Sequence, residues 1–286
     1  MNRLNAAARA QVLNCLIEGC SIRSTVRMTG VSKKAVTRLL VEAGNVAAEY
    51  QDRVMRNLTC RRIQVDEMWG FCHAKDRNVT PEIAAKVPGA GSVWLWVAMD
   101  ADTKIVPCVM LGDRNGATAH EFVSDLASRL RYRVQMTTDG HRPYLEAVES
   151  AFGAQIDYAM LVKLYGNTAD ATSPERRYSP AQCIGTVPTV VTGRPDPEHI
   201  STSFVERQNW TVRTTMRRYT RLSNGFSRKI ENHMAAVALN YFAYNFIKIH
   251  TTLRTSPAMA AGVTTRLFDV MDLVNLLIES EAEKAA

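Results

Sequence analysis

Apolar positions recur at helical spacing in three short runs within residues 1–50, which predicts three helices. Ser21 is placed to cap the second helix and Gly30 to end it. Ser32 is placed to cap the third helix, which we expect to end near Gly44. A helix, a glycine-containing turn and a second helix form the helix-turn-helix pattern.

The second helix of such a pair enters the DNA major groove, and its outward side chains contact the duplex. The outward polar residues here are Ser32, Lys33, Lys34, Thr37 and Arg38. We therefore predict a DNA-binding domain at residues 1–50. The alternative is an ordinary three-helix bundle with a basic face.

After a polar linker at 51–60, the pattern changes to one typical of strands and helices in a mixed sheet. Strands are predicted at 63–72, 93–99, 105–111, 134–138 and 156–164, and helices at 117–131 and 143–152. Three antiparallel-type strands followed by helix–strand–helix–strand is the order of a ribonuclease H-like fold. We predict an α/β (α+β) class, with a ribonuclease H-like mixed sheet and flanking helices in a catalytic domain at 61–250.

The second half of the chain is predicted to be mostly helical beyond a long Pro-, Gly- and Thr-rich connection at 166–200. We expect a hairpin inside that connection around Gly185 to Gly193. Helices are predicted at 203–221 and 230–249, and a tail at 251–286 ends in a helix at 264–286.

Composition narrows the class of protein. The 286 residues are 46% hydrophobic, enough for one sizeable core and a small extra domain. A net charge of +7 favours a polyanionic partner, although a solvated basic surface is the alternative. The apolar stretch 234–247 is too short to span a bilayer, and the start of the chain lacks a secretory signal. We expect no membrane association and a place in the bacterial cytoplasm or nucleoid.

Three acids stand out against this background. Asp66 lies inside an apolar strand, Asp139 ends a strand before a glycine, and Glu206 lies on a helix beside an apolar stripe. Carboxylates that converge from different elements hold the divalent metals of phosphodiester-cleaving sites. Each acid also has an ordinary explanation as a turn cap or surface residue, and Asp100 and Asp102 are expected to serve a hairpin turn. The side chain of Glu67 is expected on the opposite face of its strand from Asp66, which makes Glu67 the second choice as ligand.

The sequence segments around these acids resemble those of a known protein family. The segments VDEMWGF at 65–71, WLWVAMD at 94–100 and TTDGHRPY at 137–144 resemble the first two acid segments of transposases of the insertion-sequence-one family. Residues 178–229, with VERQNWTVRTTMRRY, resemble the stretch that leads into the glutamate helix, and 244–264 resembles the tail. The resemblance implies a DDE transposase.

Several roles follow from that resemblance. Asp66, Asp139 and Glu206 become the catalytic, metal-binding triad for two Mg²⁺ (or Mn²⁺) ions. Asn209, Arg213 and Arg217, on one stripe with Glu206, are expected to hold phosphates. Trp210 is expected either to stack on an unpaired base or to lie in the core, and His141 to be a surface histidine. Relatives often carry a cysteine-based zinc module, but no paired Cys/His spacing occurs here, so we expect no zinc.

The predicted activity is cleavage of DNA at insertion-sequence ends and strand transfer into target DNA. The partners would be double-stranded DNA, comprising terminal inverted repeats and target, and further copies of the chain in a homo-oligomer. Two alternatives remain: a non-catalytic DNA-binding repressor derived from a transposase, and a ribonuclease H-like nuclease that cuts without joining.

Overall fold

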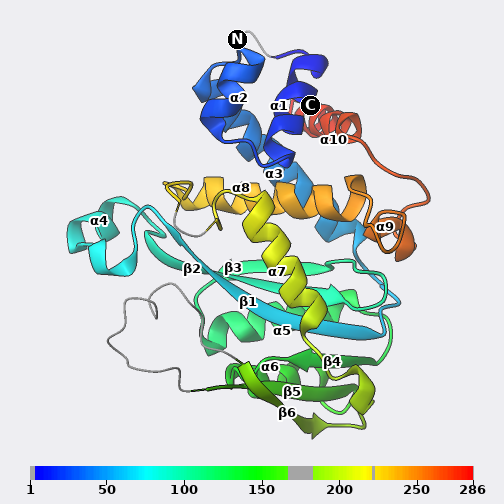
Figure 1. Ribbon diagram of the computed structural model, residues 1–286. Coiled ribbons are helices and arrows are strands. Elements are labelled where there is room, and N and C mark those ends of the chain that lie inside the picture. Colours follow the sequence, from blue (N-terminus) through cyan, green and yellow to red (C-terminus); the bar gives the residue numbers. More distant parts are fainter. Residues whose placement is uncertain (1–3, 167–182, 221–222, 286) are drawn as a thin grey trace.

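A helical head sits on a sheet-based body in the computed structural model, which describes residues 4–166, 183–220 and 223–285 (Figure 1). The head comprises α1 (Ala6–Ile17), α2 (Ile22–Thr29), α3 (Lys33–Val54) and α10 (Val270–Glu283). Residues 167–182, within the predicted long connection, lie outside the described residues.

Local signals place the starts of α2 and α3 and the end of α2 as predicted. The Ser21 side chain accepts a hydrogen bond from Ser24 N at the start of α2, and Ser32 accepts one from Ala35 N at the start of α3. Gly30 ends α2 in the left-handed region, with φ of 70°, which costs glycine little. Caps satisfy backbone N–H groups that have no partner inside the helix, so short helices can start at defined residues.

Helix α3 does not end near Gly44 as predicted but continues to Val54. Gly44 lies where α3 crosses α8 (Ile230–Phe242), and a Cβ atom on it would lie 2.4 Å from the Ala235 carbonyl oxygen. Here glycine permits a close helix crossing instead of breaking the helix. The predicted linker at 51–60 therefore begins inside α3.

The body is built on a six-stranded mixed sheet in the order β3-β2-β1-β4-β5-β6. The strands are β1 (Arg62–Cys72), β2 (Gly91–Asp100), β3 (Cys108–Gly112), β4 (Val134–Thr138), β5 (Ile156–Tyr165) and β6 (Cys183–Thr192). Strands β1, β2 and β3 pair antiparallel, β4 pairs parallel with β1 and β5, and β6 is antiparallel to β5. The predicted fold class is confirmed: a mixed α/β sheet with flanking helices, in the ribonuclease H-like order.

Two strand predictions were wrong in detail. Strand β3 begins at Cys108 instead of Ile105, because the Asn245 side chain takes both backbone hydrogen bonds of Val106 that a strand partner would need. The predicted hairpin around 185–193 is a single strand, β6, paired with β5. Its pairing partner lies across the connection at 166–182, so local turn residues did not indicate it.

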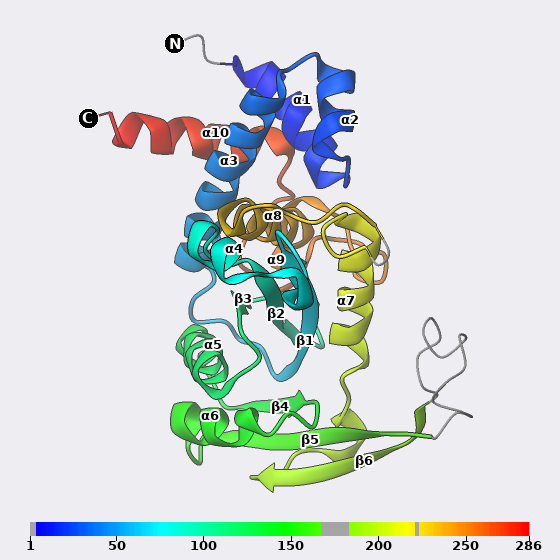
Figure 2. The same cartoon turned by 90° about the vertical axis from the view of Figure 1, so that its left-hand side faces the viewer.

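Helices cover both faces of the sheet (Figure 2). Helices α5 (Gly116–Arg129) and α6 (Pro143–Phe152) lie on one face, and α7 (Ser203–Thr215) and α8 lie toward the other. Alternation along β1 divides its side chains between the two: Val65 packs in the cluster with α5 and α6, and Met68 in the cluster with α7. Helix α7 ends at Thr215, six residues before the predicted end.

The remaining helices connect these layers. Helix α4 (Pro81–Lys86) lies between β1 and β2, α8 continues into a π-helical turn at Ala243–Ile247, and α9 (Pro257–Ala260) follows. The final helix α10 begins at Val270, not at 264, after an Asp269 capping box. No helix in the described ranges is both long and apolar enough to cross a bilayer.

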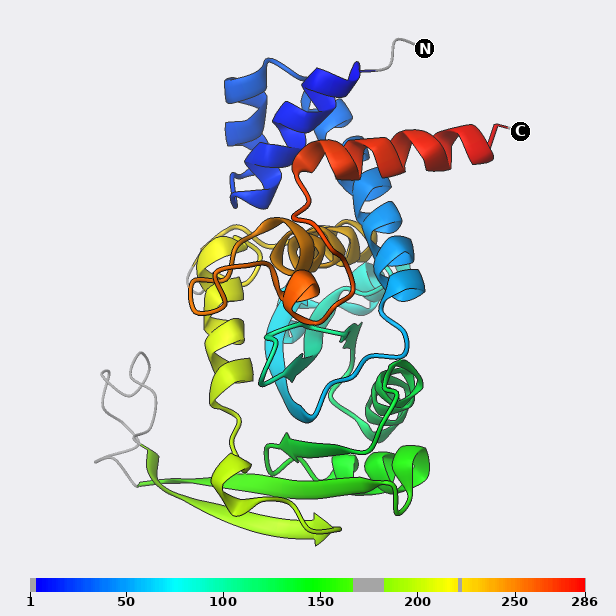
Figure 3. The same cartoon turned by 90° about the vertical axis from the view of Figure 1, so that its right-hand side faces the viewer.

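The two ends of the described chain meet in the head (Figure 3). Helix α10 packs against α1 and α3, and Arg9 Nη2 lies 3.1 Å from Glu281 Oε1 with only 8% of the arginine side chain exposed. Such a shielded ion pair costs more to break than a surface pair, since one buried charge would be left alone. The head is thus a product of sequence-distant segments.

Gly44→Ala should destabilise the protein by about 1–3 kcal/mol, because the added methyl group overpacks the α3–α8 crossing. Urea unfolding followed by circular dichroism measures this change. The control is Gly116→Ala in α5, where no atom lies within 4 Å of the new Cβ and helix propensity favours alanine by up to about 1 kcal/mol. Equal effects of the two substitutions would contradict the close crossing.

Candidate functional site

An opening between β1 and β4 positions the site. The two strands pair only between Arg62–Gln64 and Gln135–Thr137, and β1 then continues while β4 ends at Thr138. The residues that follow the paired segment in each strand therefore face the gap. Crevices at the carboxyl ends of parallel strands are common ligand sites in α/β sheets.

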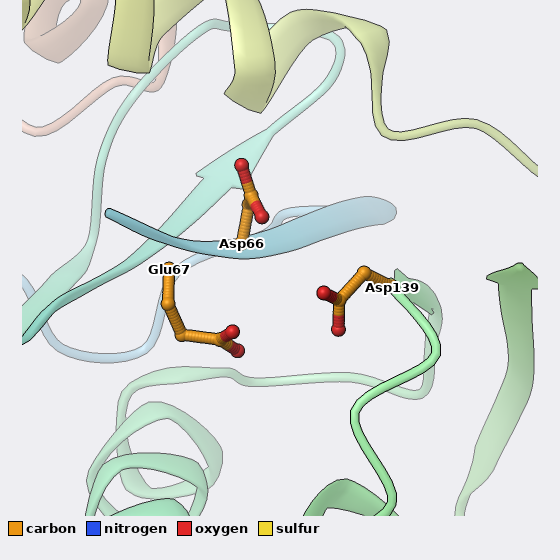
Figure 4. A group of neighbouring side chains, drawn as sticks. All are labelled: Asp66, Glu67 and Asp139. Atoms are coloured by element: carbon orange, nitrogen blue, oxygen red, sulfur yellow. The ribbon is translucent and has the colours of Figure 1, made fainter. Parts of the chain in front are cut away.

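Three carboxylates converge at this opening, and we call them the acid cluster: Asp66, Glu67 and Asp139. One oxygen of each lies within 4.8 Å of an oxygen of the other two. Figure 4 shows Asp66 and Glu67 leaving opposite faces of β1, with Asp139 to the right of both. The opposite orientation expected for Glu67 is confirmed, yet both side chains reach the same place because β4 no longer separates the two faces.

Glu206 reaches the same cleft from α7. It lines an open cleft of about 590 Å³ together with Asp66 and Asp139. Its Oε1 atom accepts from the Thr202 hydroxyl and lies 2.5 Å from Lys163 Nζ on β5. All three acids predicted from the sequence therefore face one cleft, but Glu206 is ion-paired outside the acid cluster.

Burial and mutual repulsion raise the pKa values of two carboxyls in the acid cluster. Burial, followed by the charge of Asp139, raises the pKa of Asp66 to about 6. The same two causes, in the same order, raise the pKa of Glu67 to about 7. A site that disfavours its own negative charges gains when cations enter it, so the cluster has the character of a divalent-metal site.

Arg114 partly compensates these charges, and the sequence analysis missed it. Its Nε atom donates to Glu67 Oε2 at 3.1 Å, and its Nη2 atom donates to Asp139 Oδ2 at 3.3 Å. The guanidinium also lies 5.0 Å from the centre of the Trp94 ring. It comes from the loop before α5, where no periodicity or motif marked it.

Asn209 lies one turn along α7 from Glu206 and holds Asp66. Its Nδ2 atom donates to Asp66 Oδ2 at 2.8 Å, and the residue is only 5% exposed. Its Oδ1 atom is buried and has no hydrogen-bond partner among the described residues. The amide is therefore placed to orient the first acid, whereas its predicted contact with phosphate remains a prediction.

Only part of the predicted stripe of polar residues lies on α7. Arg213 lies in the last turn of α7, but Arg217 follows the end of the helix at Thr215, so it does not continue the stripe. Trp210 is 54% exposed, with the Arg207 guanidinium 4.5 Å from its ring centre, so the core placement considered for it was wrong.

His141 is half-buried at the cleft, so it is only partly the surface histidine that we expected. Its ring packs edge-on against Tyr144 at 5.8 Å, and its Nε2 atom is buried with no hydrogen-bond partner in the described part of the chain. Burial lowers the pKa of His141, as does the Arg114 charge. Its backbone N–H donates to Asp139 Oδ1 at 2.9 Å, which helps to fix that carboxylate at the strand end.

Asp100 and Asp102 serve the turn after β2, as expected. Asp100 Oδ2 accepts from the Thr103 backbone N–H at 2.8 Å and from its hydroxyl at 2.7 Å, and Asp102 forms an ion pair with Arg62. Their carboxylates are thus engaged near the start of β1, outside the acid cluster.

The residues predicted to contact DNA lie at the start of α3. Lys33, Lys34 and Arg38 are exposed, and Arg38 Nε lies 3.6 Å from Glu42 Oε1. Thr37 is half-buried and donates to the Lys33 carbonyl oxygen, and the Ser32 hydroxyl is occupied in capping the helix. Of the five predicted contacts, Lys33 and Lys34 therefore have the side chains most available to bind DNA.

Comparisons with known proteins do not assign a function to this chain. No family model and no curated protein matches it. Among solved structures, a piggyBac transposase synaptic complex with hairpin DNA is 11% identical, with a TM-score of 0.44, and the match covers 96% of this chain and 70% of that one. The Mos1 strand transfer complex is 13% identical with a TM-score of 0.24, covering 84% and 77%. Similarities this slight carry no argument about function.

Glu67→Gln should make the protein more stable at pH 8 by about 2 kcal/mol and change little at pH 4.5. The folded-state pKa lies above the unfolded value, so the folded state holds more protons between these pH values. The wild type therefore loses stability as pH rises through this window, and the glutamine variant loses less. Urea unfolding across pH 4.5–8 measures the difference.

Asp157→Asn is the control of opposite sign. Arg133 lowers the pKa of Asp157 to about 2, so the wild-type carboxylate contributes stability at neutral pH that disappears as pH falls toward 2. The asparagine variant should be less stable at pH 7 and approach the wild type in acid. A Glu67→Gln effect that grows toward low pH would contradict the buried, repelled state of Glu67.

Proposed function

We propose that the chain is a DDE transposase, which cuts DNA at the ends of an insertion sequence and joins the freed 3′ ends to target DNA. The observation that carries this proposal is the convergence of Asp66, Asp139 and Glu206 on one cleft from three different elements. The resemblance of the surrounding segments to insertion-sequence-one transposases supports it.

The residues of the cleft fit two divalent cations, Mg²⁺ or Mn²⁺. Asp66 and Asp139 would hold them, Glu206 would complete the coordination of one, and Glu67 would provide a further oxygen ligand. Oxygen-only donors suit hard cations. When bound, such a pair activates a nucleophile and neutralises charge on the attacking and leaving oxygens of a phosphodiester.

Neighbouring side chains prepare the acids for that role. Asn209 holds the Asp66 carboxylate toward the cleft, and the His141 backbone N–H holds Asp139. Arg114 balances Glu67 and Asp139, and Lys163 balances Glu206. Arg213 and Arg217 would meet the phosphates of bound DNA, and exposed Trp210 would stack on an unpaired base.

The head would recognise double-stranded DNA through α3, with residues 1–50 as its DNA-binding domain and Ser32, Lys33, Lys34, Thr37 and Arg38 at the interface. A homo-oligomer on DNA would bring two element ends together. The protein would work in the bacterial cytoplasm or nucleoid, on terminal inverted repeats and target DNA.

Asp139→Asn should lower the rate of cleavage of end-sequence DNA with Mg²⁺ by more than about 100-fold, beyond the loss typical for residues that only support a metal ligand. The asparagine side chain has one neutral oxygen in place of two oxygens that share a negative charge, so it cannot neutralise and hold the cations as the carboxylate would. Gel analysis of labelled duplexes that carry the element's terminal repeats measures cleavage and strand transfer together.

Glu149→Gln, an exposed acid on α6, is the matched control and should keep the wild-type rate. An Asp139→Asn variant as active as the wild type would sink the assignment. Duplex binding without cleavage by the wild type would point to a repressor, and cleavage without joined product to a nuclease.

Lys33→Ala/Lys34→Ala should weaken duplex binding and reduce the slope of log affinity against log salt by about 1 for each lysine that contacts a phosphate. Fluorescence anisotropy at several salt concentrations measures both quantities. The control, Arg61→Ala/Arg131→Ala, removes two exposed charges from the body and should leave the slope nearly unchanged. Equal losses in both variants would count against α3 as the DNA-contacting helix.

A further inference from the structure

A group of aromatic side chains lies near the end of β1 that leads to α4, on the strand face that also carries Glu67. Trp69 is 40% exposed, and its ring centre lies 5.7 Å from that of Phe71 at an angle of 32°. The Phe71 ring lies 4.9 Å from that of Phe226, at 35°. We call Trp69, Phe71 and Phe226 the aromatic platform.

Hydrogen bonds hold the exposed Trp69 ring in place. Its Nε1 atom donates to the Ser92 hydroxyl at 2.9 Å, and that hydroxyl donates to the Asp76 carboxylate. The Ser92 backbone N–H donates to the same carboxylate at 2.6 Å. An aromatic ring that stays exposed to solvent contributes little to the free energy of folding. Because the Trp69 ring is already fixed in orientation, it loses little conformational entropy when a flat ligand stacks on it.

Backbone pairing also fixes Phe226. The segment after α7 joins the end of β1 through a parallel bridge between Cys72 and Ser227, and the His73 N–H donates to the Ser227 carbonyl oxygen at 2.8 Å. The platform therefore combines two distant segments on one short extension of the sheet.

One basic side chain lies against the platform rings, and two more follow Phe226 in the sequence. Lys75 Nζ lies 6.0 Å from the Trp69 ring centre and 5.8 Å from that of Phe71. Arg228 and Lys229, which follow Phe226, are exposed. The neighbouring carboxylate of Asp76 is engaged by Ser92. Aromatic faces next to cations are the chemistry with which proteins bind single-stranded nucleic acid.

The platform lies next to the acid cluster along β1. Trp69 lies two residues along β1 from Glu67, about 7 Å away. Its cross-strand partner is Trp94, against which Arg114 packs while it contacts Glu67 and Asp139. A strand that leaves the cleft along β1 would therefore meet first Trp94 and Trp69, and then Phe71.

We propose that the aromatic platform binds unpaired bases of a DNA single strand next to the acid cluster. This inference rests on the proposed function for its biological setting, but the binding itself needs neither metal nor catalysis. Paired bases are stacked inside a duplex and cannot use the platform, so single strands are preferred.

Trp69→Ala should weaken binding of a fluorescein-labelled oligo(dT) by at least about fivefold, and Phe71→Ala should weaken it similarly. Trp69→Phe, which keeps a ring without the bond to Ser92, should retain most of the affinity. Fluorescence anisotropy in EDTA measures these values, and circular dichroism checks that each variant is folded.

Tyr132→Ala is the matched control. Tyr132 is 57% exposed with the Arg131 guanidinium 5.1 Å from its ring centre, but it precedes β4, at the other end of that strand from Asp139. It should bind oligo(dT) as the wild type does. Wild-type affinity in Trp69→Ala, or an equal loss in Tyr132→Ala, would overturn the proposal.

Two further binding measurements distinguish this proposal from the proposed catalytic function. Duplex binding should not change in Trp69→Ala, and an equal loss on duplex and single strand would overturn the preference for unpaired bases. Asp139→Asn should bind oligo(dT) at least as well as the wild type. If the wild type fails to cleave DNA while its oligo(dT) binding still depends on Trp69, the proposed function fails and the platform stands.

Discussion

The mutual repulsion of Asp66, Glu67 and Asp139 is the unfavourable interaction that the geometry of the site has to overcome. Three carboxylates with oxygens within 4.8 Å of one another, shielded from much of the solvent, would push apart unless the backbone held them. Long β1 and short β4 provide that hold by separating at this point. Arg114 and Asn209 then stabilise an arrangement that the acids alone would oppose.

The parts of this design that depend on neighbours in sequence could be predicted from the sequence. The caps at Ser21 and Ser32 and the bounds of β4 and α6 follow from local turn chemistry and from alternation of apolar residues. Asp139 could be identified as a candidate site residue for the same reason, since an acid that directly follows a short apolar strand lies at the edge of the sheet.

Features that depend on distant partners could not be predicted in this way. Gly44 has the chemistry of a helix end and became a crossing point because α8 packs there. Val106 left its strand because the Asn245 side chain, remote in sequence, pairs with its backbone. Glu67 joined Asp66 although strand alternation separates them, because the neighbouring strand ends. In each case a tertiary contact decided between two locally acceptable outcomes.

Helix α3 acts as a strut between the head and the body. Its 22 residues form a rod of roughly 33 Å. Its first turns carry the exposed lysines, and its later turns are locked against α8 through Gly44. Each residue of a helix adds about 1.5 Å and a rotation of about 100°. Under the proposed function, the length of this one helix would set both the spacing and the angular phase between DNA bound at its first turns and the acid cluster, and a single inserted residue would change both.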